Sequence, residues 1–113
     1  MVEKTVLVVL RMSPFNSVRL SEGLRMTLGL TLSQNALKVL FTGLSVFALL
    51  PSDSMPYDCS KHLSFLKELE IPIYADIESI DEFHLEDLLE GVETVDRTGM
   101  KKMFEEAEAV IPY

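Results

Sequence analysis

A nearly continuous apolar run near the N-terminus, Thr5 to Leu10, most constrains what this chain can fold into. The run is rich in valine and has no alternation of polar and apolar residues, which a strand with one solvated face would show. It therefore predicts a strand that is buried on both faces, as inside a parallel sheet. We expect this segment to be the central strand of the sheet.

The next forty residues predict a strand–helix–strand unit around that run. Residues 18–34 are long enough for a crossover helix, and a second strand-like run, Leu37 to Thr42, ends at Gly43. Two parallel strands need a crossover connection of about a dozen residues or more, usually a helix. This unit predicts an α/β protein with a parallel sheet.

The crossover segment itself has an ambiguous pattern. Between Leu24 and Leu32 apolar residues alternate strictly, as in a half-buried strand, yet Leu20, Leu24, Leu28 and Thr31 also follow helical spacing. Asn16 or Ser17 could cap a helix that starts there. We favour the helix because the parallel strand pair requires a crossover.

The rest of the chain predicts further short elements within one domain, residues 1–113. After Gly43 we expect helical turns over Leu44–Leu50, a surface loop from Pro51 to Asp58, and a helix over Cys59–Glu68 with Asp58 as a cap. A strand over Ile71–Ala75 follows, and then a helix from Ser79 or Asp81 to about Glu90 that Gly91 closes. The last elements are a strand over Val92–Val95, a helix over Asp96–Ala107 and a strand over Ala109–Tyr113.

Composition narrows the class of protein. The net charge of −8 argues against nucleic acid as a partner, because phosphates attract basic surfaces. The longest apolar run is shorter than the roughly 20 residues that span a bilayer, and no secretory pattern opens the chain, so we expect a cytoplasmic protein without membrane contact. The mean hydropathy of +0.22 is high for a small domain. This excess predicts a homo-oligomer, with Met26, Leu30 and Val46–Leu50 at the interface.

Four polar residues fall where the strands of a parallel sheet should end. Ligands of such sheets bind beyond the carboxyl ends of the strands, where Ser13, Asn16, Ser45 and Asp76 should gather. They are the candidate ligand-binding residues, although for each one taken singly we favour a role as a turn-former or helix cap. A dinucleotide cofactor is not expected, because no glycine-rich loop follows the first strand.

The only cysteine, Cys59, is a candidate nucleophile because a helix start can lower the pKa of a thiol. His62, one turn later, could assist it, and Asp58 would oppose it. We favour the other interpretation, in which Cys59 is a small, half-buried apolar residue. His84 lies among acidic residues, but such spacing is typical of a solvated helix face, and it shares no ligand spacing with His62. No metal site is predicted.

Several short motifs resemble the DsrE/DsrF-like sulfur-relay family. They are Ser13-Pro14-Phe15 after the first strand, Glu22-Gly23-Leu24-Arg25 in the helix, the run from Gly43 to Pro51, and the closing Glu108 to Tyr113. The run from Gly43 is most similar to the DsrF/TusC branch. The resemblance implies a three-layer α/β/α domain with a five-stranded parallel sheet, found in dimers, trimers or hexamers. It also implies a role in passing persulfide sulfur between proteins, for sulfur oxidation or tRNA thiolation.

One position departs from that family. Its sulfur-carrying members have a cysteine at the end of the third strand, where this chain has Ala75 or Asp76. Neither residue can form a persulfide. We therefore expect a non-catalytic oligomeric or binding subunit, without a cofactor, whose partners are its own copies and other sulfur-relay proteins. The alternatives are a sulfur carrier that uses Cys59 and an unrelated α/β module that binds a small ligand.

Overall fold

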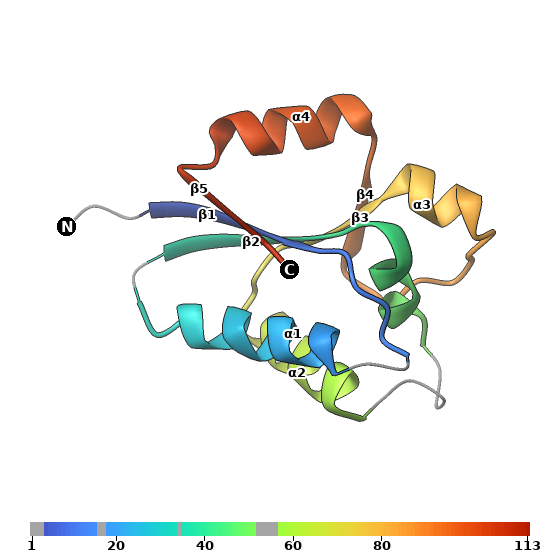
Figure 1. Cartoon of the computed structure of the whole chain (residues 1–113), viewed down its shortest axis with the longest axis horizontal. Helices are drawn as coiled ribbons and strands as arrows, with labels where there is room; N and C mark the ends of the chain where they lie inside the picture. The colour runs from blue at the N-terminus through green and yellow to red at the C-terminus, as the bar shows by residue number, and fades with distance from the viewer. Residues whose placement is uncertain (1–3, 16–17, 34, 52–56) are drawn as a thin grey trace.

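The computed structural model describes residues 4–15, 18–33, 35–51 and 57–113. Strands and helices alternate along the chain (Figure 1). In order they are β1 (Lys4–Leu10), α1 (Arg19–Leu30), β2 (Asn35–Phe41), the 3₁₀ helix η1 (Gly43–Leu49), α2 (Tyr57–Glu68), β3 (Ile73–Asp76), α3 (Ile77–Glu82), β4 (Val92–Val95), α4 (Arg97–Glu106) and β5 (Ala109–Pro112).

The five strands form one parallel sheet in the order β4-β3-β2-β1-β5. β1 lies inside the sheet and pairs with β2 from Lys4 opposite Asn35 to Leu10 opposite Phe41. The predicted parallel sheet is therefore confirmed. The central strand is β2 and not β1. β3 and β4 lie on one side of β2, and β1 and β5 lie on the other.

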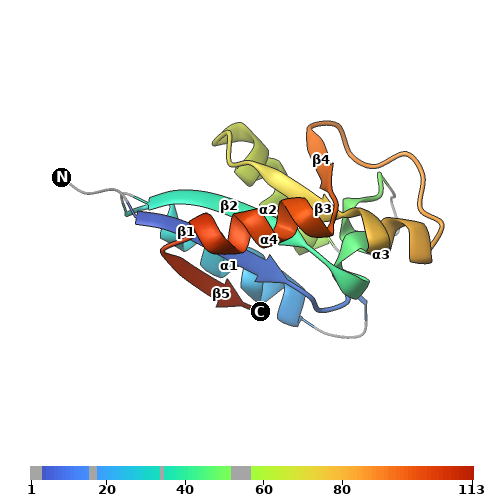
Figure 2. The ribbon, with the colours of Figure 1, turned by 90° about the horizontal axis from the view of Figure 1, so that it is seen from above.

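Helices cover both faces of the sheet, which explains the uninterrupted apolar run of β1. α1 and α2 lie on one face and α4 on the other (Figure 1), and α4 crosses the sheet when the molecule is seen from above (Figure 2). Val6, Val8 and Leu10 belong to the larger core cluster with α1 and α2. Leu7 and Val9 belong to a smaller cluster with Met103 of α4. The three-layer α/β/α architecture is confirmed.

The ambiguous segment after β1 is the helix α1, as predicted. Leu20 and Leu24 are fully buried, and Met26, Leu28 and Leu30 are half-buried against the same core cluster. The N-cap is Val18, whose side chain makes no capping hydrogen bond; Asn16 and Ser17 lie outside the described residues. A crossover between parallel strands thus overrides the alternating pattern.

The helix predicted to run to Glu90 is wrong in its extent. α3 has Asp76 as its N-cap and ends at Glu82. The backbone then takes positive φ angles at His84 (54°) and Asp87 (55°), which interrupt a helix. The irregular path allows Leu85, Leu88 and Leu89 to pack against the larger core cluster. The Leu89 amide also donates to the Leu49 carbonyl at 2.8 Å, so tertiary contacts replace helical ones.

The structure also corrects the start of α2. This helix begins at Tyr57 and not at Cys59, so Asp58 lies within the helix and not at its N-cap position. Residues 52–56 of the predicted loop lie outside the described residues. Val46 and Leu49 of η1 are fully buried, and the Phe47 ring packs against Phe83 with centroids 5.0 Å apart. The chain itself thus covers most of Val46–Leu50, while Phe47 and Leu50 are only half-buried, and the place of this segment at a subunit interface stays a prediction.

Two glycines of α1 should respond in opposite ways to alanine. A Cβ at Gly23 would lie 2.9 Å from Cδ1 of Tyr113, whereas a Cβ at Gly29 meets nothing within 4 Å. Gly29→Ala should raise the free energy of unfolding by about 0.5–1 kcal/mol through helix propensity. Gly23→Ala should lower it by about 1 kcal/mol, because overpacking outweighs that gain. Urea denaturation measures both variants; equal stabilisation would show that the Tyr113 ring moves aside freely.

Candidate functional site

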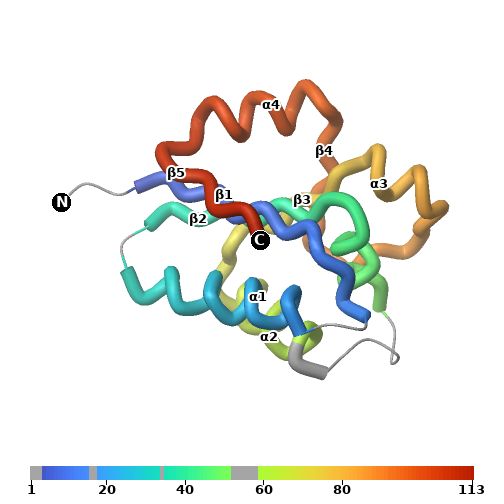
Figure 3. The backbone as a smooth tube through the Cα atoms, viewed as in Figure 1, coloured from blue at the N-terminus to red at the C-terminus, as the bar shows by residue number. Residues whose placement is uncertain are grey.

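Asp76 sits at the carboxyl end of β3, where the strand passes directly into α3. Only 7% of the surface of Asp76 is exposed to solvent. Figure 3 shows this junction at the same end of the molecule as η1, which follows β2. The parallel topology brings these two strand ends together, as the sequence predicted.

The Asp76 carboxylate is fully engaged in hydrogen bonds inside the protein. Oδ2 accepts from the hydroxyls of Thr42 at 2.8 Å and Ser79 at 2.9 Å. Oδ1 accepts from the Glu78 amide at 3.0 Å, which makes Asp76 the N-cap of α3. The Ser79 hydroxyl oxygen in turn accepts from the Gly43 amide at 2.9 Å. This set of contacts, the Asp76 network, ties β2 and η1 to β3 and α3.

The other predicted strand-end residues are also committed to the fold. The buried Ser45 hydroxyl lies 2.6 Å from the Leu10 carbonyl oxygen and 2.9 Å from that of Thr42, and donates to them. The Ser13 hydroxyl oxygen accepts from the Phe15 amide at 3.0 Å within a turn. Asn16 lies outside the described residues. Ser45 and Asp76 therefore meet around Thr42, as predicted, but their contacts are those of turn-formers and helix caps.

Cys59 lies in the first turn of α2 and points into the core. Only 2% of its surface is exposed, and it belongs to the larger core cluster with Leu63 and Leu66. This burial matches the interpretation of Cys59 as a small apolar residue. His84, by contrast, is exposed and lies beyond the end of α3, so the helix face on which it was placed does not exist there.

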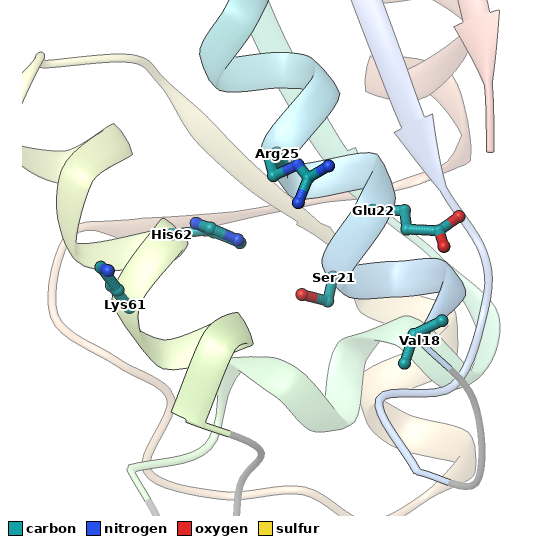
Figure 4. A pocket seen from close by; sticks show the side chains of 6 residues that line it. All are labelled: Val18, Ser21, Glu22, Arg25, Lys61 and His62. Carbon is teal, nitrogen blue, oxygen red and sulfur yellow. The ribbon is translucent and has the colours of Figure 1, made fainter.

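A groove between α1 and α2 is a second candidate site, and the sequence did not indicate it. The groove has a volume of about 560 Å³ and is lined by Val18, Ser21, Glu22, Arg25, Lys61 and His62. Figure 4 shows the Ser21 hydroxyl and the His62 ring directed toward the space between the helices, whereas the Arg25 side chain lies across α1 and Lys61 points away from α1. The residues come from segments about forty positions apart, and only the packing of α1 on α2 brings them together.

The fold and these two sites define a class of protein: a small three-layer α/β domain with a parallel sheet, whose strand ends are closed by hydrogen bonds. The chain belongs to the DsrE/DsrF-like family, whose model matches residues 4–113. The resemblance seen in the motifs is therefore confirmed at the level of the family. No curated protein matches the sequence.

Two solved structures share the fold at low sequence identity. The YchN protein from E. coli superposes with a TM-score of 0.83 at 21% identity, covering 99% of this chain and 100% of YchN. MTH1491 from Methanobacterium thermoautotrophicum, a protein of unknown function, superposes with a TM-score of 0.69 at 20% identity, covering 99% of this chain and 100% of that one. At these identities the two comparisons establish the fold alone.

Within the described ranges, no helix combines the length and the apolar character needed to cross a bilayer. The longest helices, α1 and α2, have 12 residues each. About 20 residues are needed to span the hydrocarbon core.

Proposed function

We propose that this protein is a subunit of an intracellular sulfur relay, of the DsrF/TusC branch, which binds other relay proteins and does not carry sulfur itself. The observation that supports the proposal is the chemistry of the β3–α3 junction. Ala75 is fully buried there, and the Asp76 carboxylate holds the junction closed through the Asp76 network. A carrier needs an accessible thiolate at such a point, and neither side chain supplies one.

The position of Cys59 supports the same proposal. A thiol must meet a persulfide donor on the surface and then an acceptor protein, so a carrier cysteine has to be reachable by both. Cys59 is 98% buried in the larger core cluster, which also contains Leu63. Its use as a carrier would require α2 to detach from the core. The alternative of a Cys59 carrier is therefore less favoured than a binding subunit.

Sulfur loading tests the proposal. The folded protein is incubated with a persulfide donor and its intact mass is measured. We expect no gain of sulfur, because the only thiol is buried and the strand-end cysteine is replaced. A stoichiometric gain of one sulfur atom that disappears in Cys59→Ser would overturn the proposal and make Cys59 the carrier.

A matched control shows that the donor works on this protein. Ser60 neighbours Cys59 in α2, and its residue is exposed. The double variant Cys59→Ser/Ser60→Cys moves the thiol by one residue, from the core to the surface. This variant should take up one sulfur atom under conditions in which the wild type takes up none.

We further propose that the protein self-associates through the outer face of α2. Phe65 and Leu69 lie one helical turn apart, at and just beyond the end of this helix, with 44% and 52% of their surfaces exposed. Contiguous exposed apolar residues are typical of protein interfaces.

Light scattering at micromolar concentration should give a mass well above 12.7 kDa. Phe65→Asp should lower that mass, because a charge in an apolar interface costs association free energy. Phe104 of α4 is also 42% exposed but lies on the other face of the sheet, so Phe104→Asp is the control and should leave the mass unchanged. A monomeric wild type would contradict the proposal.

A further inference from the structure

The groove between α1 and α2 gathers hydrogen-bond donors from two helices. Arg25 and Ser21 come from α1, and Lys61 and His62 come from α2. Ser21 and His62 are half-buried at its walls, whereas Arg25 and Lys61 are exposed at its rim. Ser21 and His62 face each other across the groove in Figure 4, and the Arg25 side chain lies across α1 beside it. Its volume of about 560 Å³ lies in the range of small-molecule sites.

The two cations of this groove are not neutralised by the fold. Within the described part of the chain, Arg25 and Lys61 form no hydrogen bond or ion pair; the salt bridge there joins Arg97 to Glu78. Among the residues whose side chains the structure describes, Glu22 is the one acidic residue that lines the groove. Its carboxylate accepts a hydrogen bond from the Tyr113 hydroxyl at 3.3 Å, and it points away from His62. The groove therefore presents positive charge to a ligand.

Basic and acidic residues are distributed unequally along the chain, which favours anion binding in this groove. Residues 1–67, which supply α1 and all but the last residue of α2, contain seven basic and four acidic residues. Residues 68–113 contain three basic and fourteen acidic residues. A protein with a net charge of −8 repels anions on average, so a basic groove is the place on its surface where an anion is attracted.

We infer that the α1–α2 groove binds a small molecule through a tetrahedral oxyanion, a phosphate or sulfate group. The guanidinium of Arg25 has the planar fork that pairs with two oxyanion oxygens, and Lys61 adds a second charge. The Ser21 hydroxyl and the His62 ring supply further polar contacts at the wall. The inference is independent of the sulfur-relay proposal, because neither Cys59 nor the β3–α3 junction lines the groove.

The test uses inorganic phosphate and sulfate as probes, with chloride at equal ionic strength as the reference. Titrations are followed by amide chemical shifts of the full chain. We expect saturable shifts around residues 21–25 and 61–62. Arg25→Gln should weaken binding by about tenfold or more, because it removes roughly one charge-assisted hydrogen-bonded pair. Arg25 is exposed, so the variant should fold, and Lys61→Gln provides a second, independent variant.

Two exposed lysines of α4, Lys101 and Lys102, form the matched control, because they carry the same charge outside the groove. Lys101→Gln/Lys102→Gln should leave the affinity unchanged. Shifts no larger than those with chloride, or shifts that Arg25→Gln leaves intact, would overturn the inference. Tighter binding of a glutamate-rich peptide than of phosphate or sulfate would also overturn it, because the groove would then be a docking surface for a protein.

Discussion

Asp76→Ala is expected to lower the free energy of unfolding by about 3 kcal/mol. The variant loses the N-cap of α3, which is worth about 1 kcal/mol. It also leaves the hydroxyls of Thr42 and Ser79 without their acceptor in a largely buried place, at about 1–3 kcal/mol. Most domains are stable by only about 5–15 kcal/mol, so the loss is a large fraction of the total.

Asp96 provides the matched control for this prediction. It is also an aspartate N-cap, accepting from the Gly99 amide at 2.7 Å, but its residue is exposed. Asp96→Ala should cost only about 1 kcal/mol, the worth of a cap alone. Guanidinium denaturation of both variants gives the comparison. Equal losses would show that the hydroxyl contacts of Asp76 add nothing, and that the junction is not held by a network.

The sheet could be predicted because its inner strands β1 and β2 are covered on both faces and are therefore mostly apolar. The run from Thr5 to Leu10 has no solvent-facing positions to fill with polar residues, since α1 and α4 cover opposite faces. The same requirement identified α1 despite its alternating pattern. Prediction failed after α3, because Leu85, Leu88 and Leu89 have helical spacing in the sequence but reach the core along a backbone with positive φ angles at His84 and Asp87.

The state of the candidate site could be predicted only in part. Topology placed Asp76 and Ser45 at the same end of the sheet. Whether their side chains are free to bind a ligand depends on hydroxyl groups from other segments, such as that of Thr42, which lies 34 residues before Asp76. The α1–α2 groove could not be predicted for a related reason, because Arg25 and Lys61 line the same groove only when the two helices pack together. Sequence spacing indicates neither kind of contact.

The proposed role as a binding subunit depends on the absence of an accessible carrier thiol. DsrE/DsrF-like membership rests on the match over residues 4–113, whereas the role rests on two positions, the β3–α3 junction and Cys59. At both positions the structure shows burial: Cys59 lies in the larger core cluster, and the Asp76 network occupies the β3–α3 junction. The accessibility of Cys59 therefore decides between a binding subunit and a carrier.

The rate at which Cys59 reacts with an alkylating reagent tests that point most directly. The rate is measured in the folded protein and again in denaturant, with Cys59→Ser/Ser60→Cys as the exposed reference. A thiol that is 98% buried reacts only through opening of the structure, so we expect alkylation in the folded state to be slower by about a hundredfold or more. Alkylation of folded wild type as fast as that of the reference variant would contradict the burial of Cys59 and favour a sulfur carrier.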